Sequence, residues 1–143
     1  MFSEEDKYAV SIEEYAEKKY IKKFRKLHKN NWDITQESIV QMLERAPRTI
    51  LTDKLVEIRC TGECGFYKCY FRIHKTKNSS KSSGCRAIVY FRKKDLKAFV
   101  LLAYSKNFAK YSEGHETNWI IGEVRKNFPE YWKQYEIALE SDI

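Results

Sequence analysis

The hydrophobic pattern of this 143-residue chain changes its period near residue 55. Before that point, apolar side chains recur three or four residues apart, which is typical of amphipathic helices. After it, segments rich in β-branched and aromatic residues are separated by turn residues or charged tips, which indicates strands. The change of period predicts an α+β fold in which N-terminal helices pack against a sheet.

The expected elements follow from this pattern. The predicted helices are an N-terminal hairpin, 12–29 and 33–45, and two C-terminal helices, 116–128 and 130–140. The predicted strands are 55–59, 66–74, 85–92 and 98–106, with residues 7–12 as a candidate fifth. The strand connections are short enough for an antiparallel sheet of four or five strands.

Length and linker composition predict one domain over residues 1–143, with a core at about 8–113 and a C-terminal helical extension at 114–143. No apolar run reaches the ~18 residues needed to span a bilayer. The N-terminus, MFSEEDKYAV, lacks the apolar region of a signal peptide. We therefore expect a cytoplasmic protein with no membrane partner.

The four cysteines, at positions 60, 64, 69 and 85, have the spacing C-x3-C-x4-C-x15-C. This spacing lacks the paired C-x2-C knuckles of common zinc ribbons. In a chain without an export signal, reduced thiols are expected rather than a disulfide framework. Cys69 also alternates with Phe71 and Ile73, as a core-facing strand residue does. We expect no metal and no cofactor.

Charge is unevenly distributed along the chain. Residues 54–110 carry 14 lysines and arginines against three acids, whereas residues 112–143 carry three against seven. A basic centre of this kind favours a polyanionic partner, most simply nucleic acid. The alternative is that these lysines and arginines only solvate strand edges.

The strand FYKCYFRIH, residues 66–74, sorts by period two into a core-facing side and a polar side. The polar side carries Lys68, Tyr70, Arg72 and His74. Arg86 begins the next strand and lies close enough across the ladder to join this row. With helices on one face of the sheet only, the row would lie on an open face.

Such a row suits phosphodiester chemistry without a metal. Arginine grips phosphate through two parallel hydrogen bonds and stabilises charge in the transition state. Lysine, tyrosine or histidine can transfer protons, and the 2′-OH of RNA supplies the nucleophile. On composition alone, a solvated polar face without activity carries equal weight.

The loop before Arg86 reads NSSKSSG, a polar and basic composition that predicts a flexible connection. Gly84 permits a sharp turn, and Lys81 adds positive charge, so the loop is a candidate phosphate clamp. The clamp interpretation fails if Arg86 is buried in a structural ion pair away from Lys68 and Arg72.

The run YKCYFRI, then KSSGCRAIVYF, then AFVLLAYSKN resembles the RelE/HigB-type toxins of bacterial toxin–antitoxin modules. The resemblance covers about residues 8–113, is most specific over 81–107, and ends in a YSE string at 111–113. It implies a small α+β endoribonuclease that cleaves mRNA, usually on the ribosome, by 2′-OH attack. It also implies neutralisation by a cognate antitoxin protein.

Carried over by position, the resemblance implies roles for individual residues. The implied catalytic residues are Lys68 for proton transfer, Arg72 and Arg86 for phosphate binding, and Tyr111 for orienting the substrate base. Tyr70 and His74 are secondary acid–base candidates. The candidate RNA-binding cations are Lys75, Lys77, Lys81 and Lys106.

The sequence also departs from the family pattern. Tyr70 stands where some members have a second lysine, and Asn107 replaces an arginine. The C-terminal helices extend beyond the compact core. The alternative is therefore a non-catalytic protein of the same fold, such as a gyrase poison or a phage or plasmid factor that binds host machinery. A simple nucleic-acid-binding domain is a third interpretation.

Overall fold

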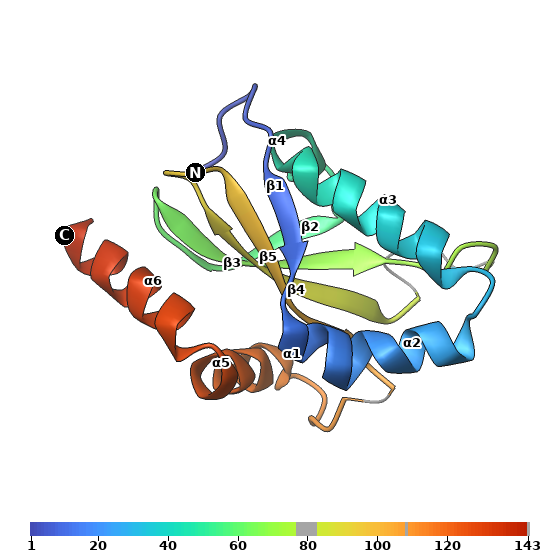
Figure 1. The fold of residues 1–143 in the computed structure, drawn as a ribbon. Helices are drawn as coiled ribbons and strands as arrows, with labels where there is room; N and C mark the ends of the chain where they lie inside the picture. The colour runs from blue at the N-terminus through green and yellow to red at the C-terminus, as the bar shows by residue number, and fades with distance from the viewer. Residues whose placement is uncertain (77–82, 108, 143) are drawn as a thin grey trace.

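The computed structural model describes residues 1–76, 83–107 and 109–142. It is an α+β structure built on a five-stranded sheet with strand order β1-β5-β4-β3-β2 (Figure 1). The strands are β1 (Ala9–Ile12), β2 (Leu55–Cys60), β3 (Cys64–Phe71), β4 (Cys85–Arg92) and β5 (Lys97–Ser105).

The sheet is mixed, which corrects the prediction of an antiparallel sheet. Strands β2 to β5 form an antiparallel meander, but β1 pairs in parallel with β5. The reason is the position of β1, which adds to the free edge of β5 and then leads directly into a helix. Sequence pattern identifies such a short edge strand, but it does not fix its direction.

The N-terminal helices and one face of the sheet share the first hydrophobic core. These helices are α1 (Glu14–Ala16), a π-helical turn η1 (Glu17–Ile21), α2 (Lys22–Leu27), α3 (Trp32–Glu44) and α4 (Ala46–Thr49). Trp32 is fully buried and its ring stacks on Phe24, with 5.0 Å between the ring centroids. Both rings also contact Phe71 of β3, so the end of that strand is fixed against the helices.

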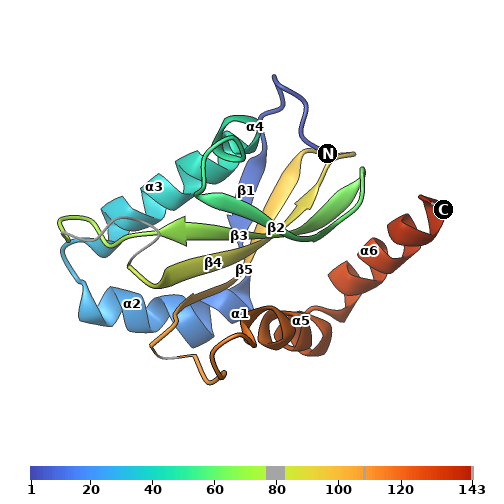
Figure 2. The ribbon, with the colours of Figure 1, turned by 180° about the vertical axis from the view of Figure 1, so that it is seen from behind.

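The C-terminal helices cover the opposite face of the sheet, which was expected to be open. They are α5 (Glu116–Asn127) and α6 (Pro129–Ser141), and α6 and α3 lie on opposite sides of the strands in Figures 1 and 2. Ile120 and Val124 are buried in this second core, and Trp132 stacks on Phe66 of β3. The physical reason is that β3, β4 and β5 carry apolar and aromatic residues on both faces, and both faces must be covered.

The four cysteines form no disulfide within the described residues. Cys64, Cys69 and Cys85 are buried, Cys60 is half-buried, and all four are free thiols. Burial raises the pKa of the Cys69 thiol to about 12. The described parts of the chain contain no cluster of three or more metal-ligating His, Cys, Asp or Glu side chains. Every helix there is too short or too polar to cross a bilayer.

Candidate phosphate-binding cluster

The register of the sheet aligns three polar side chains on neighbouring strands. Tyr70 of β3 lies opposite Arg86 of β4, and Arg86 lies opposite Tyr104 of β5. Lys68 precedes Tyr70 by two residues, so it projects from the same face of β3. The ring centroid of Tyr70 lies 5.2 Å from the Lys68 ammonium and 5.2 Å from the Arg86 guanidinium carbon. Both cations therefore make cation–π contacts with this ring.

The carboxylate of Glu116, in the first turn of α5, lies at the centre of this arrangement. Its Oε1 lies 2.7 Å from the Nζ of Lys68. Its Oε2 lies 3.0 Å from the Nε of Arg86 and accepts hydrogen bonds from the hydroxyls of Tyr104, at 2.8 Å, and Tyr111, at 3.2 Å. We call Lys68, Arg86, Tyr104, Tyr111 and Glu116 the Glu116 cluster.

The cluster is largely shielded from water. The exposed fraction of the side chain is 14% for Lys68, 12% for Arg86 and 17% for Glu116. Two cations at this degree of burial need an anionic partner, because the free energy of removing an unpaired charge from water is high. Glu116 supplies that partner and leaves the three groups with a net charge of about +1 at neutral pH.

Arg86 is held firmly but is not fully hydrogen-bonded. Its Nη1 donates to the carbonyl of Gly84 at 2.8 Å. Its buried Nε is close to Glu116 but does not point at the carboxylate, so this N–H has no hydrogen-bond acceptor among the described residues. A buried donor without an acceptor is rare in folded proteins. The Glu116 carboxylate therefore neutralises Arg86 without satisfying its Nε–H.

Gly84 shapes the approach to Arg86. It adopts φ +77°, and an added Cβ would lie 3.3 Å from Cγ of Lys106. Its carbonyl accepts hydrogen bonds from both the Lys106 backbone N–H and Arg86. The predicted role of Gly84 as a sharp turn is therefore confirmed, although residues 77–82 of the preceding loop lie outside the described residues.

An open hollow of about 640 Å³ leads from solvent to the cluster. Its lining residues are Arg86, Lys106, Asn107, Tyr111, Glu113, Gly114, Glu116 and Thr117. Lys106, a candidate RNA-binding cation, is exposed and lines the hollow. Arg86 and the Glu116 carboxylate, both largely buried, also line this hollow.

The contacts within the Glu116 cluster determine the protonation states of its carboxylate and its two tyrosines. Burial by itself raises the pKa of Glu116, but hydrogen bonds from Lys68 and Tyr104 and the charges of Lys68 and Arg86 bring it below its ordinary value. Glu116 is therefore ionised at neutral pH. Burial and the nearby carboxylate raise the pKa of Tyr111 to about 12, and they raise the pKa of Tyr104 strongly. Both tyrosines are neutral hydrogen-bond donors.

Arg72 and His74 do not join the cluster, which corrects the predicted row. Strand β3 ends at Phe71, and the chain then turns, with Lys75 in the left-handed region at φ 68°. The strict alternation of a strand therefore stops before these two residues. Arg72 donates to the carbonyl of Thr76, and the backbone N–H of His74 donates to Oγ1 of Thr35 on α3. Both side chains line a separate pocket beside α3.

The structure agrees with one part of the clamp interpretation and disagrees with another. Arg86 is in a part-buried ion pair, away from Arg72 but beside Lys68. The part of the prediction that joined Arg72 to Arg86 is wrong, and the part that joined Lys68 to Arg86 agrees with the geometry. Of the other candidate RNA-binding residues, Lys75 is exposed in the turn after β3, and Lys77 and Lys81 lie outside the described residues.

Sequence reasoning missed Tyr104 and Glu116. Tyr104 was detectable, because period two places it on the same face of its strand as Lys106. Glu116 carried a weaker signal. It follows the YSE string by three residues and belongs to the acidic C-terminal region, whose charge complements the basic centre.

The chain was compared with known proteins in three ways. No family model, no curated protein and no solved structure matches it.

Proposed function

We propose that this protein is a RelE/HigB-like endoribonuclease that cleaves mRNA, acting in the cytoplasm on ribosome-associated transcripts and held in check by a cognate antitoxin. The observation that supports the proposal is the convergence of Lys68, Arg86 and Tyr111 on one oxyanion, the carboxylate of Glu116. The N-terminal helices followed by an antiparallel meander fit the RelE arrangement.

In this proposal the Glu116 carboxylate stands where a phosphate of the substrate binds. A carboxylate and a phosphate present the same kind of oxygen acceptor to arginine, lysine and phenol donors. Arg86 would hold the scissile phosphate and stabilise the charge that develops on it, with its unused Nε–H as one donor. Lys68 would protonate the leaving 5′-oxygen, and Tyr111 would orient the neighbouring base.

The proposed reaction uses RNA, these side chains and solvent water. The 2′-oxygen bonds to phosphorus, the bond from phosphorus to the 5′-oxygen breaks, and the products are a 2′,3′-cyclic phosphate and a 5′-hydroxyl. The 2′-OH gives its proton to solvent water, and the 5′-oxygen takes one from the Lys68 ammonium, which is then reprotonated from solvent. Glu116 is a poor acceptor for the 2′-OH proton, because three hydrogen-bond donors and the Arg86 charge already surround it and its pKa is lowered.

Glu116 therefore acts in this proposal as an internal counter-ion that RNA must displace. Displacement requires movement of the first turn of α5, or rotation of the Glu116 side chain into the hollow. In this proposal, the arrangement with Glu116 between Lys68 and Arg86 is a closed form of the site.

The test compares wild-type protein with Arg86→Gln on a defined RNA presented on programmed ribosomes. Matched substrates carry either ribose or a single 2′-deoxyribose at the mapped cleavage position. Wild-type protein should cut the ribose substrate and leave a cyclic phosphate, and the deoxyribose substrate should remain intact. Arg86→Gln should lower the cleavage rate by roughly 10²–10³-fold. Growth arrest on expression of both proteins without cleavage by either would refute the nuclease proposal.

One observation favours a second candidate, a non-catalytic nucleic-acid-binding protein on the same scaffold. Glu116 neutralises part of the cluster and Arg72 lies elsewhere, so a catalytic row is incomplete in the closed form. This candidate predicts RNA or DNA affinity with a steep salt dependence and no product. A gyrase supercoiling assay distinguishes its gyrase-poison version.

A further inference from the structure

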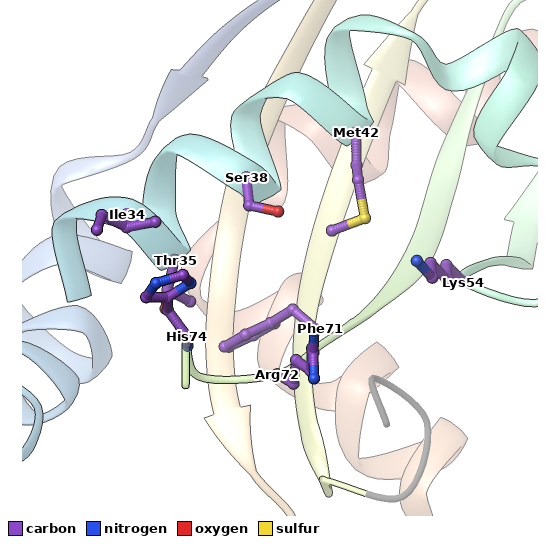
Figure 3. A pocket seen from close by; sticks show the side chains of 8 residues that line it. All are labelled: Ile34, Thr35, Ser38, Met42, Lys54, Phe71, Arg72 and His74. Atoms are coloured by element: carbon purple, nitrogen blue, oxygen red, sulfur yellow. The ribbon is translucent and has the colours of Figure 1, made fainter. Parts of the chain in front are cut away.

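A second basic surface lies along α3 and includes Arg72 and His74, which the sequence pattern had placed on the open face of the sheet. Two adjoining pockets, of about 180 and 320 Å³, share the residues Ser38, Met42 and Lys54. Figure 3 shows the first, with Met42 extending from α3 toward Phe71 at the end of β3 and Arg72 beside it. We call the two pockets together the α3 groove.

The lining of the α3 groove is rich in cations and hydroxyls. Its basic residues are Arg45, Arg48, Lys54, Arg72 and His74, and its hydroxyl residues are Thr35, Ser38, Thr49 and Thr52. No acidic side chain is among the lining residues of either pocket. Within the described residues, none of the four lysine and arginine side chains forms an ion pair.

The backbone holds the groove in shape. The N–H of Tyr70 donates to the carbonyl of Lys54 at 2.8 Å, which places Lys54 beside the end of β3. The N–H of His74 donates to Oγ1 of Thr35 at 2.8 Å and ties the turn after β3 to α3. Of the charged residues, Arg48 lies on α4 and Arg45 at the junction of α3 and α4, whereas Lys54 immediately precedes β2 and Arg72 immediately follows β3.

We propose that the α3 groove binds phosphate groups of single-stranded RNA, as a contact separate from the Glu116 cluster. The inference rests on the proposed function for the choice of RNA as the polyanion. Exposed lysine and arginine side chains along one groove match successive phosphates, which offer oxygen acceptors along a chain. The hydroxyls of Thr35, Thr49 and Thr52 already donate to backbone carbonyls, so the lysines and arginines are the proposed phosphate contacts. The partly apolar side chains Ile34 and Met42 supply contact surface for sugar or base.

The groove is tested with a labelled, fully 2′-O-methylated oligoribonucleotide, which binds but cannot undergo 2′-OH attack. The double variant Lys54→Gln/Arg72→Gln should raise the Kd roughly tenfold at 0.1 M salt. It should also reduce the slope of log K against log salt by about 1.4, the value for two lost contacts to a single strand. Both residues are exposed, so folding should be retained, and circular dichroism checks this.

The matched control is Lys126→Gln/Lys133→Gln, which removes the same charge from exposed positions on α5 and α6. The control should keep the salt slope of wild-type protein. Equal slopes for both double variants would overturn the groove proposal. A polyglutamate peptide that binds the groove when the oligonucleotide does not would overturn it in favour of an acidic protein partner. Loss of cleavage by Arg86→Gln is measured separately, so failure of the groove leaves the nuclease proposal standing.

Discussion

The Glu116 cluster and the α3 groove hold cations in opposite ways. In the cluster, Lys68 and Arg86 are largely buried and share one internal carboxylate. In the groove, Lys54 and Arg72 are exposed and form no ion pair within the described residues. Burial accounts for the difference, because a cation can remain unpaired in water but not in a protein interior.

This difference assigns different energetic roles to the two regions. A phosphate that enters the cluster must replace Glu116, so much of its interaction energy offsets the loss of an existing ion pair. Donors that are already ordered and shielded from water are also the ones that stabilise a transition state most effectively. A phosphate that enters the groove displaces only water and adds affinity. We therefore expect the cluster to control rate and the groove to control binding.

The largest expected contrast is between Arg86→Gln and Arg72→Gln. With RNA on programmed ribosomes, Arg86→Gln should lower kcat by roughly 10²–10³-fold, because it removes a donor aimed at the reacting phosphate. Arg72→Gln should leave kcat nearly unchanged and raise KM about threefold, because it removes one exposed phosphate contact. Single-turnover and steady-state kinetics on the same RNA measure both effects.

A fall in kcat for Arg72→Gln as large as that for Arg86→Gln would contradict the separation. It would mean that Arg72 moves into the cluster when RNA binds, and would restore the row predicted from sequence. Lys93→Gln is a control for nonspecific charge loss, since Lys93 lies in the turn before β5, contacts Ser3 and lines neither site.

The cluster was partly predictable from sequence for a physical reason. Side chains in a strand alternate strictly, so Lys68 and Tyr70 had to share a face if residues 66–71 were a strand. The next strand then brought Arg86 opposite Tyr70. These predictions needed only local backbone geometry and short connections, which sequence patterns describe well.

Arg72, His74 and Glu116 were not predictable in the same way. The position at which β3 ends depends on how Phe71 packs on Trp32 and Phe24, which is a tertiary effect. Glu116 reaches the cluster because α5 folds back over the sheet, a contact between residues 48 apart in sequence. A helical pattern at 116–128 predicts the helix but not the face of the sheet that it covers.

Glu116→Gln should have the next largest effect. The amide keeps a similar shape but carries no charge, so Lys68 and Arg86 would attract phosphate without competition. We expect roughly tenfold tighter binding of the 2′-O-methylated oligonucleotide, equivalent to about 1.4 kcal/mol. The variant should also lose about 1–3 kcal/mol in the free energy of unfolding, because two part-buried cations lose their counter-ion.

Glu113→Gln is the matched control for that experiment. Glu113 lines the same hollow and is exposed, but it forms no ion pair within the described residues, so its loss changes net charge alone. Affinity should rise far less than in Glu116→Gln. If the two variants bind RNA equally, the internal counter-ion role is refuted. If Glu116→Gln binds RNA normally but cleaves none, Glu116 is instead a proton acceptor in the reaction.

The smallest expected effect is a change in the stability contributed by Glu116 at acidic pH. The folded-state pKa of Glu116 is lowered, so its contribution to stability is fully present above the unfolded-state carboxyl pKa of about 4.3 and is lost as pH falls through the lower folded-state value. Other lowered carboxyls, such as Asp95, are common to wild-type protein and Glu116→Gln, so subtracting the two unfolding curves isolates Glu116. The difference should shrink from pH 5 to pH 3. A constant difference over that range would mean that the carboxylate is not held by Lys68 and Arg86 in solution. The Glu116 cluster would then lack the internal counter-ion that distinguishes it from the α3 groove.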